Sequence, residues 1–207
     1  MPAKYRLTYF NSRGRGEVIR LIFKVADEEF EDRRMTAEDW SSIKSETPFG
    51  QVPMLEVDGK VLAQSNTICR YLAREFGLAG KDVFEQARVD MFVDLVEDLL
   101  RPMVQILYEK DEIRKEEIKE KYAKETAPTI LSQFEKHLAK NPSGFLVGDS
   151  LTWADLHFMN WLEKNWVGGK LPVETWNRFP KIKEHNKMVA SLPRVKEWLE
   201  TRPKTEL

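Results

Sequence analysis

The chain has 207 residues, 42% of them hydrophobic and 32% charged, which is the composition of a folded globular protein with one or two domains. Its 33 basic and 34 acidic residues leave a net charge of −1, without the basic excess of a nucleic-acid-binding protein. One cysteine excludes an internal disulfide, and the three histidines show no zinc-binding spacing. No apolar run approaches the ~20 residues that span a membrane, and residues 1–4 lead into a strand pattern instead of a leader peptide, so we expect a cytoplasmic protein.

The first 76 residues alternate between strand and helix patterns. Period-two alternation predicts strands, and a 3.6-residue apolar period predicts helices. These patterns place strands at 5–10, 30–35, 54–57 and 60–63, helices at 17–26 and 64–76, and an irregular segment or short helix at 36–45. The predicted order is therefore β-α-β followed by β-β-α.

A proline stands directly before the third predicted strand. Pro53 has no N–H to give to a sheet, so it must lie at the first residue or the edge of the strand, and the Val52–Pro53 bond is a candidate for the cis isomer. Asp58-Gly59 then joins two strands as a hairpin turn. This arrangement resembles a thioredoxin-like domain.

Gln64 and Ser65 lie where the fourth strand ends and a helix begins. The first N–H groups of a helix have no partner inside it, and the helix dipole adds partial positive charge there. Such a helix start is a ready site for a carboxylate. The alternative is that Ser65 simply caps its own helix.

Beyond the segment 79–82, which we predict to be a linker, no strand pattern is visible. Long helical patterns cover 83–110 and 112–140, and shorter helices are predicted to begin near Thr152, Pro180 and Pro193. We expect the first long helix to be kinked at Pro102 and the second to be interrupted near Pro128. The first should also have one apolar face, formed by Met91, Leu95, Leu99 and Met103.

Three further features have structural interpretations. Thr152 and Asp155 have the spacing of a helix cap and predict a buried polar cap that serves folding. Cys69 lies on the apolar side of its helix and is predicted to be a buried thiol, not a nucleophile. An acidic stripe on the first long helix is predicted to be a solvated face, with a divalent-cation site as the alternative; its members are Asp90, Asp94, Glu97 and Asp98.

The whole chain resembles the cytosolic glutathione transferases, and in detail their sigma class, which includes the haematopoietic prostaglandin D synthases. The motifs that carry the resemblance are Leu7-Thr8-Tyr9-Phe10 with Arg13-Gly14-Arg15, Asp39-Trp40, Lys44, Pro48 to Pro53, Leu55 to Gly59, Gln64-Ser65, Leu78-Ala79-Gly80, Thr152 to Asp155 and Arg202 to Thr205. The resemblance implies a thioredoxin-like, glutathione-binding domain at 1–78 and an all-helical domain at 83–207 that shapes the site for an electrophile.

The resemblance also implies a set of site residues. Tyr9 and Arg15 are the catalytic residues. Glutathione is bound by these two and by Trp40, Lys44, Gln51, Val52, Pro53, Gln64, Ser65 and, from the neighbouring subunit, Asp98. The electrophile is walled by Phe10, Arg15, Arg101, Gln105 and Tyr108. A homodimer is implied, with glutathione as co-substrate and no metal or other cofactor.

The proposed role of Tyr9 has a chemical basis. Tyr9 shares a strand face with Tyr5 and Leu7 and lies at the strand's end, where a phenol can point over a pocket. A free thiol has a pKa of about 8.5 and is only a few per cent thiolate at neutral pH. A phenol hydrogen bond with nearby positive dipoles lowers that pKa by roughly 2 units, about 2.7 kcal/mol, and makes thiolate the major form.

The resemblance leaves alternatives to a transferase of small hydrophobic electrophiles. One is isomerisation of prostaglandin H2 to D2, although relatives with that activity place a tryptophan near Gln105 and this chain has none there. Another is a low-activity, crystallin-like binding role. Peroxide reduction is a further possible reaction of the same thiolate.

Overall fold

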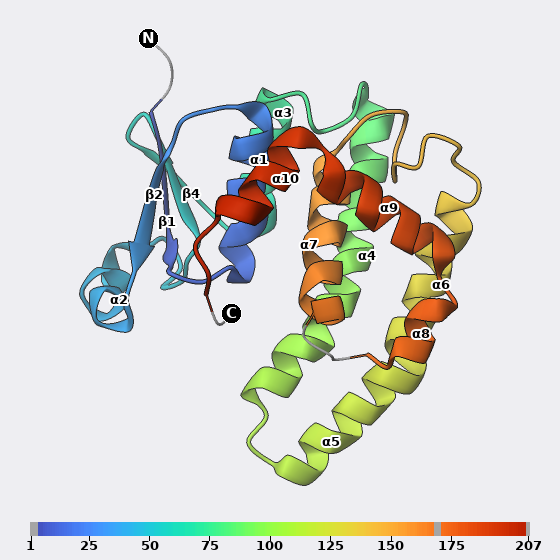
Figure 1. The fold of residues 1–207 in the computed structure, drawn as a ribbon. Helices are drawn as coiled ribbons and strands as arrows, with labels where there is room; N and C mark the ends of the chain where they lie inside the picture. The colour runs from blue at the N-terminus through green and yellow to red at the C-terminus, as the bar shows by residue number, and fades with distance from the viewer. Residues whose placement is uncertain (1–3, 168–170, 206–207) are drawn as a thin grey trace. The chain divides into compact units, whose positions relative to one another are not determined.

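The structure is a computed structural model that describes residues 4–167 and 171–205 (Figure 1). It divides into two compact units, one formed by Met1–Ala79 and Leu192–Leu207 and the other by Gly80–Ser191. We call them the sheet unit and the helical unit. Their mutual boundary at Ala79 and Gly80 falls within the segment predicted as a linker.

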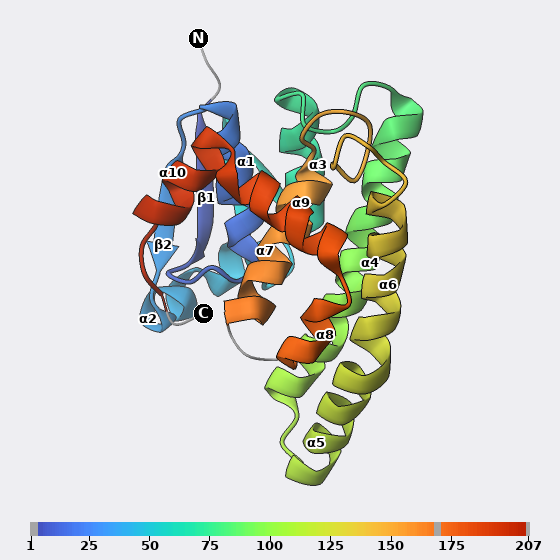
Figure 2. The same ribbon diagram turned by 45° about the vertical axis from the view of Figure 1, so that its right-hand side comes forward.

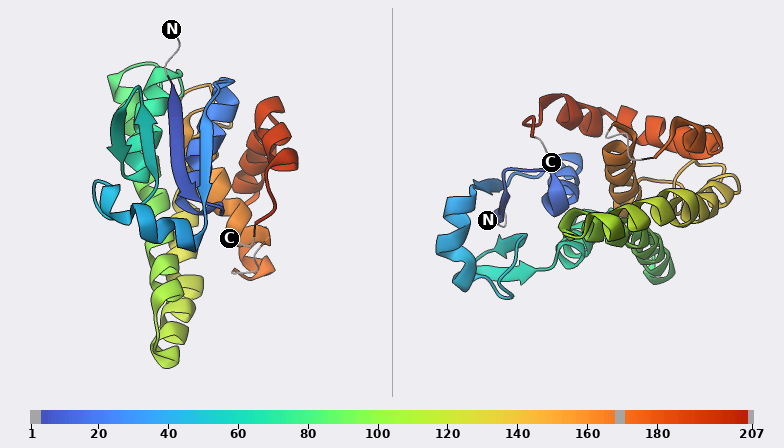
Figure 3. Two further views of the ribbon diagram at one scale, coloured as in Figure 1. Left: turned by 90° about the vertical axis from the view of Figure 1, so that its left-hand side faces the viewer. Right: turned by 90° about the horizontal axis from the view of Figure 1, so that it is seen from below.

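The sheet unit is built on a four-stranded mixed sheet, seen face-on at the left of Figure 3. The strand order is β2-β1-β3-β4; β1 is parallel to β2 and antiparallel to β3, and β3 is antiparallel to β4. Its elements are β1 (Tyr5–Phe10), η1 (Gly14–Gly16), α1 (Glu17–Ala26), β2 (Glu31–Met35), α2 (Ala37–Ile43), η2 (Lys44–Glu46), β3 (Met54–Val57), β4 (Lys60–Ala63), α3 (Ser65–Glu75) and α10 (Pro193–Thr201). The β-α-β/β-β-α order is thus confirmed.

Helices α1 and α3 pack against one another on one face of this sheet (Figure 1). Their buried apolar residues meet the inward side chains of β1 and β3, including Leu7 and Leu55, which are fully buried. Burial of such side chains, at about 1.5–3 kcal/mol each, is the main force that holds the unit together. Cys69 belongs to this core, as predicted.

The last helix belongs with the sheet unit. The sequence places α10 in the helical domain 83–207, but α10 packs on α1, and Arg194 forms an ion pair with Asp27 at the end of α1. Contacts with residues more than 160 positions away decide its place, and no local pattern reports them.

The helical unit contains the remaining helices, of which α4, α6 and α7 run alongside one another in Figure 2. They are α4 (Val83–Tyr108), α5 (Glu112–Lys121), the π-helical segment η3 (Tyr122–Thr126), α6 (Ala127–Leu138), α7 (Trp153–Val167), α8 (Val173–Asn177) and α9 (Pro180–Ser191). The predicted interruption near Pro128 takes the form of η3, which lies just before this proline. Across the described residues, none of the helices combines the length and the apolar character needed to cross a bilayer.

The buried face of α4 agrees only in part with the predicted one. Leu99 is buried as predicted, together with Val89, Phe92 and Val96, whereas Met91 is 53% exposed. Apolar residues occur on two sides of this helix, so a 3.6-residue period fits both sides. Packing against α7 selects the side with Phe92.

Candidate functional site

Strand pairing gathers the predicted site residues of the sheet unit at one end of the sheet. Phe10, the last residue of β1, pairs with the last residue of β2. In the antiparallel pairs, Met54 at the start of β3 is opposite both Thr8 and Ala63. The end of β1, the start of β3 and the end of β4 therefore lie together, and we call this edge the Tyr9 end of the sheet.

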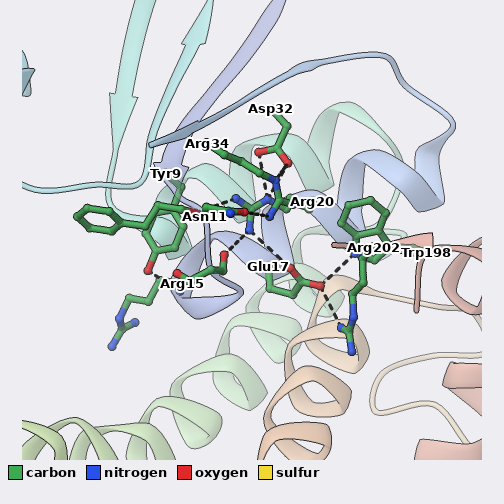
Figure 4. Close-up of polar contacts among 11 residues, drawn as sticks. Tyr9, Asn11, Arg15, Glu17, Arg20, Asp32, Arg34, Trp198 and Arg202 are labelled. Carbon is green, nitrogen blue, oxygen red and sulfur yellow. Dashed lines mark hydrogen bonds and ion pairs between the residues drawn. The ribbon is translucent and has the colours of Figure 1, made fainter. Parts of the chain in front are cut away.

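Tyr9 lies in a slot formed by the loop after β1. Its hydroxyl oxygen accepts a hydrogen bond of 2.9 Å from the backbone N–H of Arg15. Gly14 and Gly16 line the ring so closely that a Cβ on either would clash with it. A Cβ on Gly14 would lie 2.3 Å from the hydroxyl oxygen, and a Cβ on Gly16 would lie 2.6 Å from Cδ1 of the ring. Figure 4 shows the phenol directed at Arg15, whose guanidinium extends away from the hydroxyl. A hydroxyl that accepts an N–H remains able to donate its own proton.

An aromatic row extends from Tyr9 across the same end of the sheet. The ring of Phe10 makes edge contacts with the rings of Tyr9, at 5.7 Å between centroids, and Trp40, at 5.8 Å. Trp40 is carried by α2, which begins with a capping box: Thr36 Oγ1 accepts from Asp39 N–H, and Asp39 accepts from Thr36 N–H. Lys44, at the start of η2, is exposed.

Gln64 has an unusual backbone at the start of α3. Its φ of 71° lies in the left-handed region, which a glutamine rarely adopts. Gln64 is the N-cap residue, and its own side chain makes no capping hydrogen bond. Ser65 is the first helical residue, so the alternative in which Ser65 is the cap does not hold. Strain of this kind is concentrated at functional sites, and here it sets the direction of a helix start.

The loop before β3 supplies the remaining predicted residues of the sheet unit. The Val52–Pro53 peptide bond is cis, as the sequence suggested. Pro53 is buried, Val52 is half-buried and Gln51 is exposed. All three precede Met54 and so lie at the Tyr9 end of the sheet.

The candidate residues of the helical unit are exposed on the last three turns of α4. Asp98 forms an ion pair of 3.5 Å with Arg101 on its own helix. Gln105 lines an open pocket of about 460 Å³ together with Pro102, Ile118 and Tyr122, between α4, α5 and η3. Arg101 and Tyr108 are not among the residues that line this pocket.

The acidic stripe of α4 is not a uniform solvated face. Asp94 and Asp98 are exposed, but Glu97 is only 9% exposed and lies 3.3 Å from His157 Nε2 on α7. Position 97 borders the buried face of α4, and packing against α7 draws its side chain inward. Within residues 4–167 and 171–205, no group of three His, Cys, Asp or Glu side chains has the geometry of a metal site.

A buried charge cluster behind Tyr9 was not predicted from the sequence (Figure 4). Glu17 and Arg20 on α1 are almost fully buried, and Glu17 bonds to Trp198 and Arg202 across more than 180 residues of chain. The only local signal is a pair of opposite charges three residues apart in an apolar helix. Their partners are not deducible from spacing.

Two family models match the chain. The glutathione S-transferase N-terminal domain matches residues 5–74, and the C-terminal domain of the same family matches residues 97–202. With the thioredoxin-like sheet unit and the helical unit, these matches define the class. The chain belongs to the glutathione S-transferase family, and the fold and enzyme class expected from the sequence are confirmed.

Known proteins match the chain over nearly its whole length. Glutathione S-transferase 1 of Ascaris suum is 45% identical over 208 residues, 99% of each chain. The hematopoietic prostaglandin D synthase of Gallus gallus is 38% identical over 207 residues, 100% of each chain. A glutathione S-transferase of the hookworm Necator americanus, whose solved structure is described as monomeric, has a TM-score of 0.86 and 39% identity, covering 99% of this chain and 100% of its own.

Proposed function

We propose that this enzyme joins the sulfur of glutathione to small hydrophobic electrophiles, with Tyr9 stabilising the thiolate. The observation that carries the proposal is the placement of the phenol: it lies at the Tyr9 end of the sheet and accepts the Arg15 N–H at 2.9 Å. An accepted hydrogen bond polarises the O–H group and strengthens its donation to an anion. Attack by the thiolate on carbon then requires only that both reactants be held together.

The family resemblance assigns the rest of the tripeptide, and the chemistry of the residues is compatible with it. The start of α3 at Gln64 and Ser65 suits the γ-glutamyl carboxylate because helix N–H groups and the helix dipole favour an anion. Val52 pairs its backbone with the cysteinyl part as an added strand would, flanked by Gln51 and Pro53. The indole N–H of Trp40 and the ammonium of Lys44 hold the glycyl carboxylate.

A conservative substitution tests the role of Tyr9. We expect Tyr9→Phe to leave the KM for glutathione within about twofold and to lower kcat by ~10- to 100-fold near neutral pH, because the lost hydroxyl acts on the thiolate. Tyr5→Phe is the matched control, since it deletes the same atom from the same strand face inside the core and leaves kcat unchanged. Unchanged turnover of Tyr9→Phe between pH 6 and 8 would refute the assignment.

Further parts of the proposal concern the electrophile and the assembly. Phe10 and Arg15 from the sheet unit, and Arg101, Gln105 and Tyr108 from α4, are proposed to contact the electrophile. The enzyme is proposed to be a sigma-class, cytoplasmic homodimer with a role in detoxification, in which Asp98 binds the γ-glutamyl amine of the neighbouring subunit's glutathione.

A second candidate activity is the isomerisation of prostaglandin H2 to D2. It is favoured by the 38% sequence identity, over the full length of both chains, with a prostaglandin D synthase. It is disfavoured by the absence of a tryptophan near Gln105. To rank these reactions, one enzyme preparation is assayed with an aryl halide, an organic hydroperoxide and prostaglandin H2. Tight binding of glutathione without turnover of any of them would favour a binding role.

A further inference from the structure

Two charged side chains lie buried behind Tyr9 and take no part in the proposed chemistry. Glu17 is 1% exposed and Arg20 is fully buried, although both stand in the first half of the apolar helix α1. Burying a charge is costly unless it is paired and hydrogen-bonded. Their partners therefore indicate what the pair does.

Arg20 binds the loop that forms the Tyr9 slot. Its Nη1 donates to the carbonyl of Ser12 at 2.7 Å, and its Nη2 donates to the carbonyl of Phe10 at 3.3 Å. Its Nε donates to the carboxylate of Asp32 on β2 at 3.0 Å. A planar guanidinium fixes the relative direction of all three acceptors, which the ammonium of a lysine does not do.

Glu17 connects Arg20 to the C-terminal segment. One carboxylate oxygen lies 3.6 Å from Arg20 Nη1. The other accepts from the indole N–H of Trp198 at 3.1 Å and from Arg202 Nη1 at 3.0 Å (Figure 4). The end of the chain is thus fastened to the first turn of α1, directly after the slot residues Gly14 to Gly16.

The same loop carries the hydrogen bond to Tyr9. Phe10 and Ser12, held by Arg20, begin the segment that ends at the Arg15 N–H, and the Arg20 guanidinium carbon lies 5.8 Å from the centre of the Tyr9 ring. Asn11, within the segment, accepts from Arg34, which also bonds to Asp32. A shift of this loop moves the Arg15 N–H relative to the phenol, and hydrogen bonds weaken steeply with angle.

We propose that Glu17 and Arg20, together with Trp198 and Arg202, are positioning residues that hold the β1–α1 loop so that Tyr9 donates to the glutathione sulfur in the correct geometry. The proposal rests on the proposed function of Tyr9. None of the four is assigned a contact with glutathione. The C-terminal segment thereby acts on the reaction through the first turn of α1.

Two substitutions in the C-terminal segment test this proposal. Trp198→Phe removes one hydrogen bond to Glu17 and keeps an aromatic ring, and Arg202→Gln removes the cation. We expect each variant to raise the pKa of the bound glutathione thiol, measured from the pH dependence of kcat/KM and from the ultraviolet absorbance of the thiolate. At pH 6.5, kcat should fall by ~3- to 10-fold, and at high pH it should return to the wild-type value. The KM for glutathione stays within about twofold.

Lys24→Met is the matched control. The Lys24 ammonium lies 5.5 Å from the centre of the Trp198 ring, so this variant alters the packing of the same indole without touching Glu17. We expect its pH profile to equal that of the wild type. A lowered melting temperature with an unchanged pH profile in both Trp198→Phe and Arg202→Gln would overturn the positioning role.

A double-mutant cycle separates this inference from the proposed function. If the cluster acts through the phenol, Trp198→Phe has no further effect on the pH profile in the Tyr9→Phe background. An additive effect would overturn the inference while leaving Tyr9 in its role. If Tyr9→Phe itself leaves the profile unchanged, the proposed function fails and the inference fails with it.

Discussion

Gly14 and Gly16 are required by the ring that they enclose. Gly14 has a φ of 36°, and a Cβ there would lie 2.3 Å from the Tyr9 hydroxyl oxygen; a Cβ on Gly16 would lie 2.6 Å from Cδ1 of the ring. Both distances are shorter than any relaxed contact, so an alanine at either position must displace the phenol or the loop. The sequence Gly-Arg-Gly is therefore part of the proposed catalytic geometry.

Gly16→Ala is expected to lower kcat by about 10- to 100-fold, because a displacement of the phenol by about 1 Å misaligns it with the sulfur. Overpacking also lowers the free energy of unfolding by about 1–3 kcal/mol. Steady-state kinetics and urea denaturation measure the two effects. Gly59→Ala is the control: its φ of 80° brings strain, but no atom lies within 4 Å of the added Cβ, so it should lose stability and keep kcat. Full activity of Gly16→Ala would contradict the role of the slot.

Asp155 is a buried carboxylate of the helical unit with several hydrogen-bond donors around it. It is fully buried and accepts from Leu146 N–H and from the N–H and Oγ1–H of Thr152, each at 2.8 Å, and lies 3.0 Å from His185 Nε2. The buried polar cap expected from the sequence is present, and it also ties α9 and the loop after α6 to the start of α7.

Asp155→Ala is expected to lower the free energy of unfolding by about 3–5 kcal/mol, because it leaves several buried donors without an acceptor. Urea denaturation followed by tryptophan fluorescence measures the loss. Asp149→Ala removes a carboxylate six residues earlier that is exposed and paired with Lys81, and it should cause no measurable change. Equal midpoints for the two variants would show that the cap is not a folding determinant.

Elements bounded by strong local signals were predictable from the sequence. The alternation Tyr5 to Phe10 gave β1, the turn Asp58-Gly59 separated β3 from β4, and prolines at 180 and 193 marked the first residues of α9 and α10. In each case the property that determines the element lies within a few residues: a hydrophobic period of two, a positive φ at a turn or the missing N–H of a proline.

Elements decided by distant contacts were not predictable. The choice of buried face on α4 depends on α7, and the inward turn of Glu97 depends on His157. The attachment of α10 to the sheet unit depends on Glu17. Similarly, family motifs named the site residues of the sheet unit, but the left-handed backbone of Gln64 and the close packing of Gly14 and Gly16 on Tyr9 are known only from the structure.

His137 on α6 makes the stability of the helical unit sensitive to pH. Its Nε2 lies 2.7 Å from the carbonyl oxygen of Leu146, so Nε2 carries the hydrogen. Burial lowers the pKa of His137 below its usual 6.5, more than the hydrogen bond to Leu146 raises it. As pH falls below about 6.5, the unfolded chain takes up a proton that the folded chain resists. The neutral, buried His137 therefore contributes fully to the free energy of unfolding above a pH of about 6.5, and this contribution is lost as the pH falls through the folded-state pKa of His137.

His137→Gln is expected to retain a donor for Leu146 and to lose the titration. The difference in free energy of unfolding between wild type and variant should therefore shrink as pH is lowered from about 8 to about 5. Urea denaturation at several pH values measures it. Lys136→Gln, at an exposed neighbouring position, controls for the general loss of positive charge and should run parallel to the wild type. A His137→Gln curve parallel to the wild type would contradict the prediction.

At the level of the assembly, two exposed apolar side chains on α4 bear on the proposed homodimer. Phe84 is 76% exposed and Met91 53% exposed on α4, seven residues apart and so on one face of that helix. Contiguous apolar patches on a protein surface mark protein contacts, and Phe84 and Met91 are candidate members of one such contact. The proposed homodimer accounts for them, although a relative with 39% identity is described as monomeric.

Sedimentation equilibrium of the wild type is expected to give a dimer, and Phe84→Arg is expected to shift it to monomer. If Asp98 serves the partner's glutathione, the monomer should also show a raised KM for glutathione, and Asp98→Ala should show the same rise while remaining dimeric.

Complementation makes this prediction stringent. Tyr9→Phe subunits supply Asp98, and Asp98→Ala subunits supply Tyr9, so a mixed dimer contains one complete site. Mixing the two variants should therefore raise turnover at low glutathione above the mean of the separate variants. A control mixture with the monomeric Phe84→Arg, Tyr9→Phe double variant should give no gain, because subunits that do not associate share no site. Absence of any gain in the first mixture, with mixed dimers demonstrated, would mean that each subunit binds glutathione with its own residues alone.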